Sequence, residues 1–578
     1  MNVTRPFSGR LTLDRPRVSG ADLVVGAGIA VLLYVVLRLG PSLNTSRLSA
    51  HITATVSTAP SNLPYYAARS LLRMFIALFI SVVFTFVYGT AAARSRRARI
   101  VLIPLLDILQ SVPVLGFLTV TVTFFVSLFP RSILGLECAS IFAIFTSQAW
   151  NMTFSFYHSL MAQPEELDEA ARLFRLTKWQ RFWKLDVPGS MIGLVWNGMM
   201  SFGGGWFFLA ASEAITVSGH TLALPGLGSY VAAAIQAGSL SDVCWAIVVM
   251  VVLVVGVNVV FWRPLVAWAE KFRFETSEPT DRPRSLTLGV LRRSHVPALL
   301  GRSLKPVARG LDRATRPFGL AEHPLHAAPS RRRAGDIVFA VVVGAVIAYG
   351  VYRGGVYLQQ TVGFGQFPRC LYLGLLTFLR VIVLLAFSTV IWVPIGVKIG
   401  MTPRLARYAQ PVVQVLASFP ANFLFPFATV IFVAVGLSLD IGGVFLMALG
   451  AQWYILFNTI AGASAIPTEL REMAAQFRLP RRQRWRQVIL PAVFPAFVTG
   501  GITAAGGAWN ASIVAEVVNF GEHHLVANGL GAYITEATAA GSFAKVLVGV
   551  VVMSFYVVVV NRLLWRPLYA LAERRYSM

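Results

Sequence analysis

The stretch AIVVMVVLVVGVNVVF at residues 246–261 is apolar except for one asparagine, and Trp262-Arg263-Pro264-Leu265 follows it directly. A second apolar stretch, VLVGVVVMSFYVVVV at residues 546–560, precedes the same tetrapeptide, which begins at Trp565. Apolar runs of this kind are typical of helices that cross a bilayer. The two stretches therefore indicate a membrane protein whose halves are copies of one unit.

The composition of the whole chain agrees with this class. Of its 578 residues, 56% are hydrophobic and 13% are charged, whereas soluble proteins carry about 25% charged residues. The mean hydropathy is +0.67. These values exclude a disordered chain, a collagen and a secreted disulfide scaffold. The three cysteines lie far apart in apolar sequence, so they form neither a disulfide pattern nor a zinc-binding spacing.

Twelve segments are long and apolar enough to cross the roughly 30 Å hydrocarbon core of a bilayer. The expected fold class is therefore an all-α polytopic membrane protein with about twelve transmembrane helices, six in each half. The first six segments are 21–39, 70–93, 101–128, 133–160, 187–211 and 243–268, and the second six are 337–351, 372–399, 411–437, 441–463, 489–514 and 546–571.

The loops between these segments differ in charge. Arginine-rich stretches occur at 94–99, 172–184, 404–407 and 471–486, all on one side, whereas the long loops on the other side contain only Arg47. Cytoplasmic loops carry the excess of Lys and Arg, so both termini are predicted to be cytoplasmic. Loop orientation then explains the formal net charge of +25, and we favour this explanation over binding of nucleic acid or of anionic substrates. No cleavable signal peptide is expected, because the first twenty residues are polar and Arg-rich.

Matching residues run in order through both halves. Gly226-Leu227-Gly228 recurs as Gly529-Leu530-Gly531 at a shift of 303, and Pro113 recurs as Pro420 at a shift of 307. Because six spans separate the copies, they face the same way and form parallel repeats. Two such bundles predict a pseudo-twofold arrangement with a shared pathway at their interface. The expected organisation is a cytoplasmic N-terminal tail (1–20), a first repeat (21–272), a cytoplasmic Arg/Pro-rich linker with short membrane-surface helices (273–335) and a second repeat (336–578).

A cytoplasmic loop lies between the fourth and fifth spans of each repeat. Each loop starts with a proline and acidic residues, at Pro164 or Pro467, which favours the start of a helix. Small alanines beside a phenylalanine follow, and the loop ends at Pro188 or Pro491. Such a helix would fit closely into a groove of another protein. The alternative is an amphipathic helix on the bilayer surface, which we disfavour because the full pattern occurs at the same place in both repeats.

At these loops the sequence resembles the permease subunits of binding-protein-dependent ABC importers. Their cytoplasmic loop reads Glu-Ala-Ala, three residues, Gly, and later a hydrophobic residue-x-Leu-Pro. Glu169-Ala170-Ala171 matches this motif, as do Glu472 and Ala474 in the second repeat. The resemblance implies a fused permease with the type I ABC importer transmembrane fold, whose loops are coupling helices for separate ATPases. The residues expected at the ATPase contact are Glu166, Glu169, Ala170, Ala171, Phe174, Arg175, Glu469, Glu472, Ala474, Ala475, Phe477 and Arg478.

The resemblance also implies partners and a location. Two ABC ATPase subunits would bind ATP and Mg²⁺, and an extracytoplasmic solute-binding protein would deliver the solute. The chain itself lacks a Gly-x4-Gly-Lys-Ser/Thr loop, so it does not hydrolyse ATP by that route. We expect no catalytic residue, metal or cofactor in this chain, and no nucleic-acid partner. Its expected place is the lipid bilayer of a bacterial cytoplasmic (inner) membrane.

The glycine of the family motif is missing from both loops. Arg175 and Arg478 stand in its place, which suggests that the turn here does not need a left-handed backbone. As an alternative role, the two arginines would pair with acidic groups on the ATPase.

The fifth span of each repeat indicates which group of these permeases the chain resembles. Trp206 and Glu213 precede one Gly-Leu-Gly, and Trp509 and Glu516 precede the other. This pattern is similar to permeases for nitrate, sulfonates, bicarbonate and related small solutes, so a small anion is the expected solute. The four residues are candidates for the translocation pathway or a gate. The alternative for each glutamate is a structural pair with an arginine, and for each tryptophan it is packing.

Arg73 and Arg380 occupy matching places in the second span of each repeat. Snorkelling to the interface is favoured here over an anion site. For the whole chain, the alternative to an ATP-driven permease is a twelve-span secondary transporter driven by an ion gradient. A membrane-embedded enzyme or receptor would need a catalytic cluster or signalling domain, and the sequence contains neither.

Overall fold

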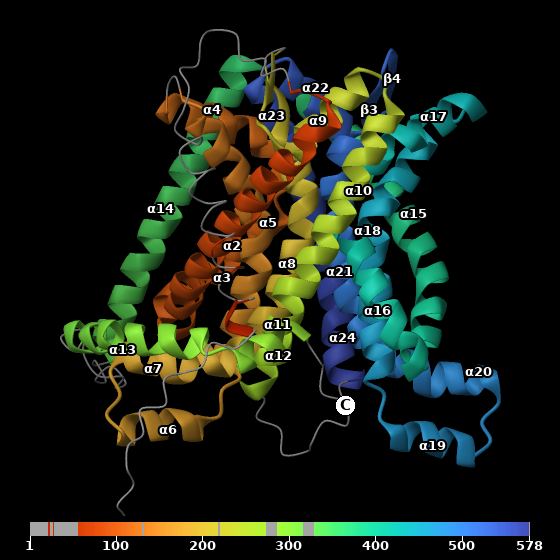
Figure 1. Cartoon of the computed structure of the whole chain (residues 1–578). Coiled ribbons are helices and arrows are strands. Elements are labelled where there is room, and N and C mark those ends of the chain that lie inside the picture. Colours follow the sequence, from red (N-terminus) through yellow and green to blue (C-terminus); the bar gives the residue numbers. More distant parts are fainter. Residues whose placement is uncertain are drawn as a thin grey trace, which may run out of the picture. The chain divides into compact units, whose positions relative to one another are not determined.

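The computed structural model describes residues 21–23, 27, 30, 56–129, 132–217, 220–272, 286–315 and 329–576. Over these residues the chain is almost entirely helical, as Figure 1 shows. The predicted tail at 1–20 lies outside the described residues, and so does most of the predicted first span at 21–39.

The first repeat contains sixteen described elements from η2 to α11, counting the short 3-10 and π turns together with the helices and strands. In chain order, after η2 (Pro60–Asn62), they are α2 (Leu63–Arg94), α3 (Arg96–Ser111), η3 (Val114–Phe117), α4 (Leu118–Leu128), α5 (Leu134–Met161), α6 (Glu165–Leu173), α7 (Lys178–Arg181), η4 (Phe182–Asp186), α8 (Val187–Glu213), β1 (Ala214–Val217), β2 (His220–Ala223), α9 (Leu227–Gln236), α10 (Leu240–Val257), η5 (Asn258–Trp262) and α11 (Arg263–Ala269).

The second repeat has the same elements in the same order. After α14 (Pro329–Thr361), they are α15 (Gln366–Gly400), α16 (Pro403–Ser418), η8 (Ala421–Leu424), α17 (Phe425–Val435), α18 (Leu439–Ser464), α19 (Thr468–Gln476), α20 (Arg481–Arg484), η9 (Trp485–Ile489), α21 (Leu490–Ala515), β3 (Val517–Phe520), β4 (His523–Val526), α22 (Leu530–Ala539), α23 (Phe543–Val560), η10 (Asn561–Trp565) and α24 (Arg566–Tyr576). Each element from α2 to α11 therefore has a counterpart from α15 to α24, which confirms the internal duplication.

Seven helices of the described chain are long and apolar enough to cross a membrane, or up to eight if a bent pair counts as one span. The predicted total of twelve therefore stays a prediction. The bent pair is α16 and the η8–α17 segment, which meet at 83° within the predicted span 411–437. The predicted span 101–128 is likewise divided, into α3 and α4. The break has a local cause, because Val112 and Phe419 each precede a proline and are extended, with ψ of 123° and 131°.

The described chain falls into two compact units. The smaller unit takes its residues from Pro164–Ile192 and Asn258–His323, together with the first described residues of the chain. It includes the linker helices α12 (Leu286–Arg293) and α13 (Val296–Ala314). The sequence predicts short helices here, and the structure confirms them. The corner between α12 and α13 is held by Asp22, whose carboxylate accepts hydrogen bonds from Ser294 Oγ at 2.8 Å and His295 N at 2.6 Å.

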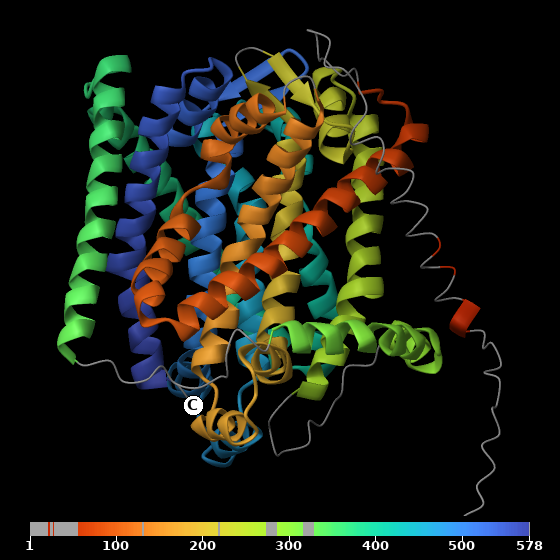
Figure 2. The same ribbon diagram turned by 90° about the vertical axis from the view of Figure 1, so that its left-hand side faces the viewer.

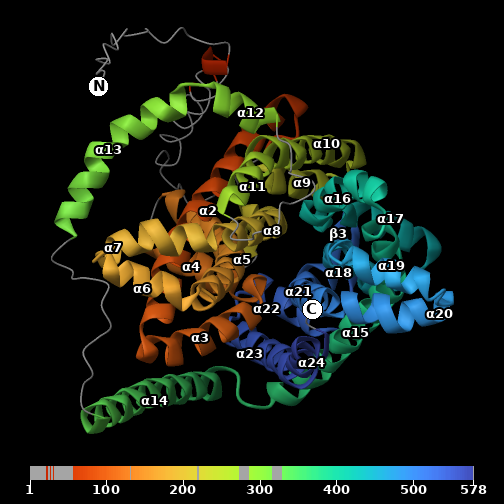
Figure 3. The same cartoon turned by 90° about the horizontal axis from the view of Figure 1, so that it is seen from below.

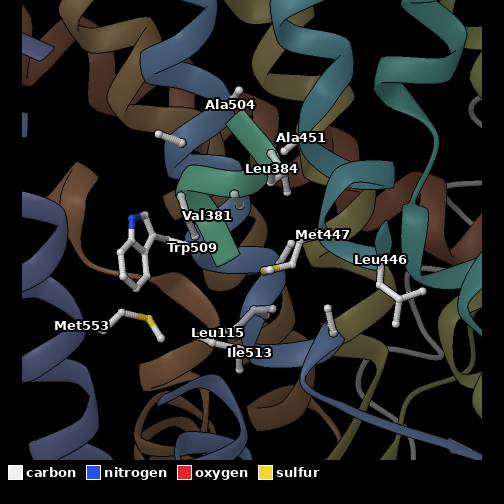
Figure 4. Close-up of a cluster of buried hydrophobic side chains, with 14 of the residues drawn as sticks. Leu115, Val381, Leu384, Leu446, Met447, Ala451, Ala504, Trp509, Ile513 and Met553 are labelled. Atoms are coloured by element: carbon white, nitrogen blue, oxygen red, sulfur yellow. The ribbon is translucent and has the colours of Figure 1, made fainter. Parts of the chain in front are cut away.

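The larger unit holds the remaining helices of both repeats. Its main packing pairs are α2 with α5, α15 with α18, and α18 with α21. Figure 2 shows α2 crossing α5, and Figure 3 shows α18 beside α21, with α14 at the edge of this unit near α23. One apolar core runs through both repeats. In Figure 4, Leu115 of the first repeat lies beside Ile513 of the second, in the same cluster as Met447 and Trp509.

The contacts between the repeats are reciprocal. Helix α3 contacts α23, and its counterpart α16 contacts α10. In the same way, α9 contacts β3 while α22 contacts β1. Swapped pairs of this kind are what a twofold relation between two copies produces. The larger unit therefore has the pseudo-twofold arrangement of parallel repeats that the sequence predicts.

Two short hairpins were not expected from the sequence. Strands β1 and β2 pair from Ala214 with Ala223 to Val217 with His220, and β3 and β4 pair from Val517 with Val526 to Phe520 with His523. Each hairpin begins at the residue after Glu213 or Glu516 and so directly extends α8 or α21.

Candidate functional site

Helix α19, the predicted coupling helix of the second repeat, exposes most of the residues predicted to contact the ATPase. Among the predicted residues of this loop, Ala474 is buried, whereas Glu469, Glu472, Ala475, Phe477 and Arg478 are exposed. The side chain of Phe477 is 72% exposed, which is unusual for an aromatic residue outside a bilayer. Arg471 Nη2 donates to the Ala463 carbonyl at 2.8 Å and ties α19 to the end of α18. The helix is thus fixed on one side and free on the other.

Helix α6, the predicted coupling helix of the first repeat, shows the same pattern within the smaller unit. Ala171 is buried and Ala170 is half-buried, whereas Glu166, Glu169, Phe174 and Arg175 are exposed. Phe174 is 78% exposed. The loop is braced by an ion pair between Arg181 and Asp168. A capping box between Thr177 and Gln180 starts the next helix.

The prediction that this turn does not need a left-handed backbone was wrong. Arg175 and Arg478 have φ of 47° and 48°, and they are the non-glycine residues with positive φ in the described chain. The hydrogen bonds explain why the conformation is kept. Leu176 N donates to the Ala171 carbonyl at 3.0 Å, and Arg175 N donates to the Arg172 carbonyl at 2.9 Å. This is the Schellman closure of a helix, which requires a left-handed residue after the cap.

The second loop closes α19 with the same two bonds. Leu479 N donates to the Ala474 carbonyl at 3.1 Å, and Arg478 N donates to the Ala475 carbonyl at 3.0 Å. A non-glycine residue in this conformation costs roughly 1–2 kcal/mol. In both loops the strained residue is the arginine that directly follows the exposed phenylalanine.

The candidate pathway residues Trp206, Glu213, Trp509 and Glu516 lie toward the C-terminal ends of α8 and α21. Glu213 is fully buried, and Arg73 Nη1 donates to its Oε1 at 2.6 Å. The same arginine donates to both oxygens of Glu137, at 2.5 and 2.7 Å, and Arg69 donates to Glu137 at 2.6 Å. Ser70 Oγ donates to Glu213 Oε1 at 2.5 Å. Helices α2, α5 and α8 are therefore joined by one buried charge cluster.

The second repeat contains the counterpart of this cluster. Arg380 Nη1 donates to Glu516 Oε1 at 2.9 Å, and its Nη2 donates to Asp440 Oδ1 at 2.6 Å. Thr377 Oγ1 donates to Glu516 Oε1 at 2.8 Å. It takes the place of Ser70 in the first repeat. We call the two sets the arginine clamps: Arg69, Ser70, Arg73, Glu137 and Glu213 in the first repeat, and Thr377, Arg380, Asp440 and Glu516 in the second.

The expectation that Arg73 and Arg380 snorkel to the interface was wrong. Their side chains are buried, with Arg73 1% exposed, and they are paired with carboxylates. The clamps match the alternative in which each glutamate pairs with an arginine and holds helices together. Sequence reasoning missed Glu137 and Asp440. They could have been found, because each is an acidic residue near the start of an apolar helix and they correspond at a shift of 303.

The clamps also explain the Gly-Leu-Gly motifs. A Cβ atom at Gly226 would collide with the carboxylate of Glu213, and one at Gly529 would collide with that of Glu516. The backbone beyond each glycine then bonds the clamp, since Leu227 N donates to Ser70 Oγ at 3.0 Å and Leu530 N donates to Thr377 Oγ1 at 2.9 Å.

The two tryptophans are buried, with Trp206 1% and Trp509 2% exposed. Trp206 packs edge-on against Phe202 at 5.7 Å, and Trp509 stacks on Tyr556 at 6.1 Å. In the second repeat, the predicted coupling residues precede the N-terminal end of α21, whereas Trp509 and Glu516 lie toward its C-terminal end. That helix has 26 residues, or about 39 Å at 1.5 Å per residue. The predicted coupling residues and the clamp of the second repeat are therefore separate sites, and α21 lies between them along the chain.

A profile of one protein family matches the chain twice. The family is described as "Binding-protein-dependent transport system inner membrane component", and the matched residues are 85–263 and 392–565, together more than half of the chain. Both matches contain a coupling loop and a clamp glutamate.

Individual relatives carry related names. The chain is 26% identical over 184 residues to the nitrate import permease protein NrtB of Leptolyngbya laminosa, covering 32% of this chain and 62% of that protein. It is 27% identical over 166 residues to the bicarbonate transport system permease protein CmpB of Synechococcus elongatus, covering 29% of this chain and 56% of that one. It is 28% identical over 160 residues to the putative aliphatic sulfonates transport permease protein SsuC of Bacillus subtilis, covering 28% and 54%.

The aligned part thus spans less than two thirds of the length of these curated relatives. Family membership rests instead on the double profile match, which agrees with the repeated elements and the repeated loop. The chain belongs to the family of binding-protein-dependent transport system inner membrane components.

Proposed function

We propose that the chain is the membrane-spanning component of an ATP-driven importer, with both pore-forming halves in one polypeptide. Family membership supports this proposal, and so does the occurrence of the same coupling helix in each repeat. Two separate ABC ATPase subunits bind ATP and Mg²⁺ and seat the α6 and α19 helices. An extracytoplasmic solute-binding protein delivers the solute. The chain lies in a bacterial inner membrane with both termini in the cytoplasm, and its repeats are 21–272 and 336–578 with the cytoplasmic linker 273–335 between them.

The proposed solute is a small anion such as nitrate, bicarbonate or a sulfonate, because the relatives named above carry those solutes in their names. The proposed mechanism is alternating access. ATP binding draws the two ATPase subunits together, the coupling helices move with them, and the two repeats open outward. Closure of the ATPases reaches the outer end of the second repeat through α21, which runs without interruption from η9 to Glu516.

The single observation that carries the proposal is the exposed phenylalanine at the end of each coupling helix. Phe174 and Phe477 are both more than 70% exposed beside a strained arginine, and such exposed apolar groups mark interaction sites. The test is co-purification of the ATPase subunits with the full chain. Phe174→Asp together with Phe477→Asp is expected to remove the ATPases and abolish ATP-dependent uptake, whereas Gln360→Asp, at an exposed glutamine of α14 outside both loops, is the control.

The same preparation tests the role of the two arginines. If they pair with acidic groups of the ATPase, Arg175→Glu with Arg478→Glu weakens co-purification. Solute uptake driven by an ion gradient in vesicles that hold this chain alone would contradict the whole proposal and support a secondary transporter.

A further inference from the structure

A hollow lies between the two repeats inside the larger unit. It is partly open to its surroundings, and the space inside it that can hold the centre of a water molecule is about 20 Å³, enough for one or two waters. Met199 and Met200 of α8 line it from the first repeat, and α16 and α18 line it from the second. Ser418, the last residue of α16, stands directly before the break at Pro420. In transporters, broken helices at the repeat interface are where solutes bind.

The lining is mostly apolar, and none of its side chains is charged. Gln414, Ser418 and Tyr454 supply an amide, a hydroxyl and a phenol, and the remaining lining side chains around the hollow are apolar. These three groups can all donate hydrogen bonds. Neutral donors hold an oxyanion without the deep trap that an arginine or lysine would make, and transport requires that a solute both bind and leave.

Two glycines bring the backbone of α8 up to the hydroxyl groups. A Cβ atom at Gly203 would lie 2.5 Å from Ser418 Oγ, and one at Gly204 would lie 3.0 Å from Tyr454 Oη. On α21, the counterpart of α8, a Cβ atom at Gly507 would lie 3.5 Å from Cε2 of the same tyrosine. The ring of Tyr454 therefore lies between the two equivalent helices, close to the pseudo-twofold axis.

The first repeat has no equivalent tyrosine. Helices α5 and α18 end at Met161 and Ser464, a shift of 303, which pairs Tyr454 with Asn151. The oxygen of the Asn151 side chain accepts a hydrogen bond from Gln110 at 3.2 Å. Near a twofold axis, the same side chain from both copies would have to occupy the same space, and the two would collide. Fusion of the two copies removes this conflict.

We propose that this hollow is a transit site for a small oxyanion, with the phenol of Tyr454 as its principal hydrogen-bond donor and Gln414 and Ser418 as additional donors. The inference rests on the proposed function and adds a residue that contacts the solute. It also makes solute contact a property of the second repeat rather than of both repeats equally.

The test uses the complete transporter, in which this chain is purified with its ATPase and solute-binding subunits and placed in proteoliposomes. Uptake of nitrate is measured, together with uptake of bicarbonate and of methanesulfonate. Tyr454→Phe keeps the ring and removes one neutral donor, so uptake is expected to fall about three- to tenfold while ATP hydrolysis stays within about twofold. Tyr88→Phe is the matched control, since its phenol donates to the Leu102 carbonyl at 2.6 Å within the first repeat.

A second variant separates solute contact from a packing role. Gly204→Ala places a methyl group against the phenol oxygen, so it is expected to lower uptake in the wild type and to have a smaller effect when Tyr454→Phe is already present. Unchanged uptake and unchanged preference among the three anions in Tyr454→Phe would overturn the site while leaving the proposed function intact. A wild-type complex that transports none of the three anions would overturn both the anion class and the site.

Discussion

The first arginine clamp gives the sharpest prediction for stability. Arg73 is 1% exposed and makes three hydrogen bonds to two buried glutamates. In Arg73→Met, Glu137 keeps its bond to Arg69, but Glu213 keeps only its neutral donors, Ser70 and the backbone of Gly228. One buried carboxylate is therefore left without a cation.

Removing one partner of a buried ion pair costs about 3–5 kcal/mol, because the remaining charge is uncompensated. We expect a loss of this size for Arg73→Met. Glu213→Gln should cost less, about 1–3 kcal/mol, because Arg73 still has Glu137. The double variant should be more stable than Arg73→Met alone, since it no longer buries an unpaired carboxylate.

The assay is unfolding of the full chain in mixed micelles with increasing SDS, followed by tryptophan fluorescence. Arg353→Met is the control, because Arg353 is exposed and its loss should change the free energy of unfolding by less than about 1 kcal/mol. The reasoning fails if the double variant is no more stable than Arg73→Met, because shape and not charge would then set the cost.

Three further predictions concern single positions. Arg478→Gly should relieve about 1 kcal/mol of left-handed strain, so hydrogen exchange of the amides that close α19 should slow about fivefold; faster exchange would contradict this. Gly501→Ala should destabilise the chain by about 1–3 kcal/mol, because its methyl group collides with Trp565, whereas Gly506→Ala, with open space around it, should be neutral or slightly stabilising by SDS unfolding. Asp107→Asn breaks a partly exposed pair with an arginine of α24 and should cost less than about 1 kcal/mol; a larger loss of SDS resistance would show that this pair is more buried in the bilayer than its exposure indicates.

The sequence was informative wherever a pattern is local or repeated. The apolar runs located most of the described helices, and the shift of 303 located the duplication and both coupling loops. The breaks before Pro113 and Pro420 were not predicted, because each lies inside an apolar run that reads as one span. Hydropathy alone hides such a break, since both halves of the run are apolar.

The pairing of charges within the clamps could not be read from local pattern. Arg73 lies near the start of the predicted span 70–93, where snorkelling is the ordinary expectation, and its partners Glu137 and Glu213 are 64 and 140 residues away. Only the packing of α2 against α5 and α8 turns the side chain inward. The prediction for the backbone of Arg175 and Arg478 was wrong for a different reason. Propensity favours glycine at such a position, but here the Schellman bonds fix the backbone and the arginine adopts the conformation they require.

Some matching positions of the two repeats hold the same residue and others differ. The clamp positions are alike, whereas positions around the hollow differ. The clamp residues Arg73 and Glu213 recur as Arg380 and Glu516, and the same atoms bond in both. Around the hollow, by contrast, Tyr454 is a lining residue, whereas the first repeat has Asn151 at the matching position. A residue that holds helices together is useful in each copy, because each copy must pack its own helices. A residue near the axis is shared by both copies, so one suffices, and the fused chain is free to place it in one repeat and leave the other to change.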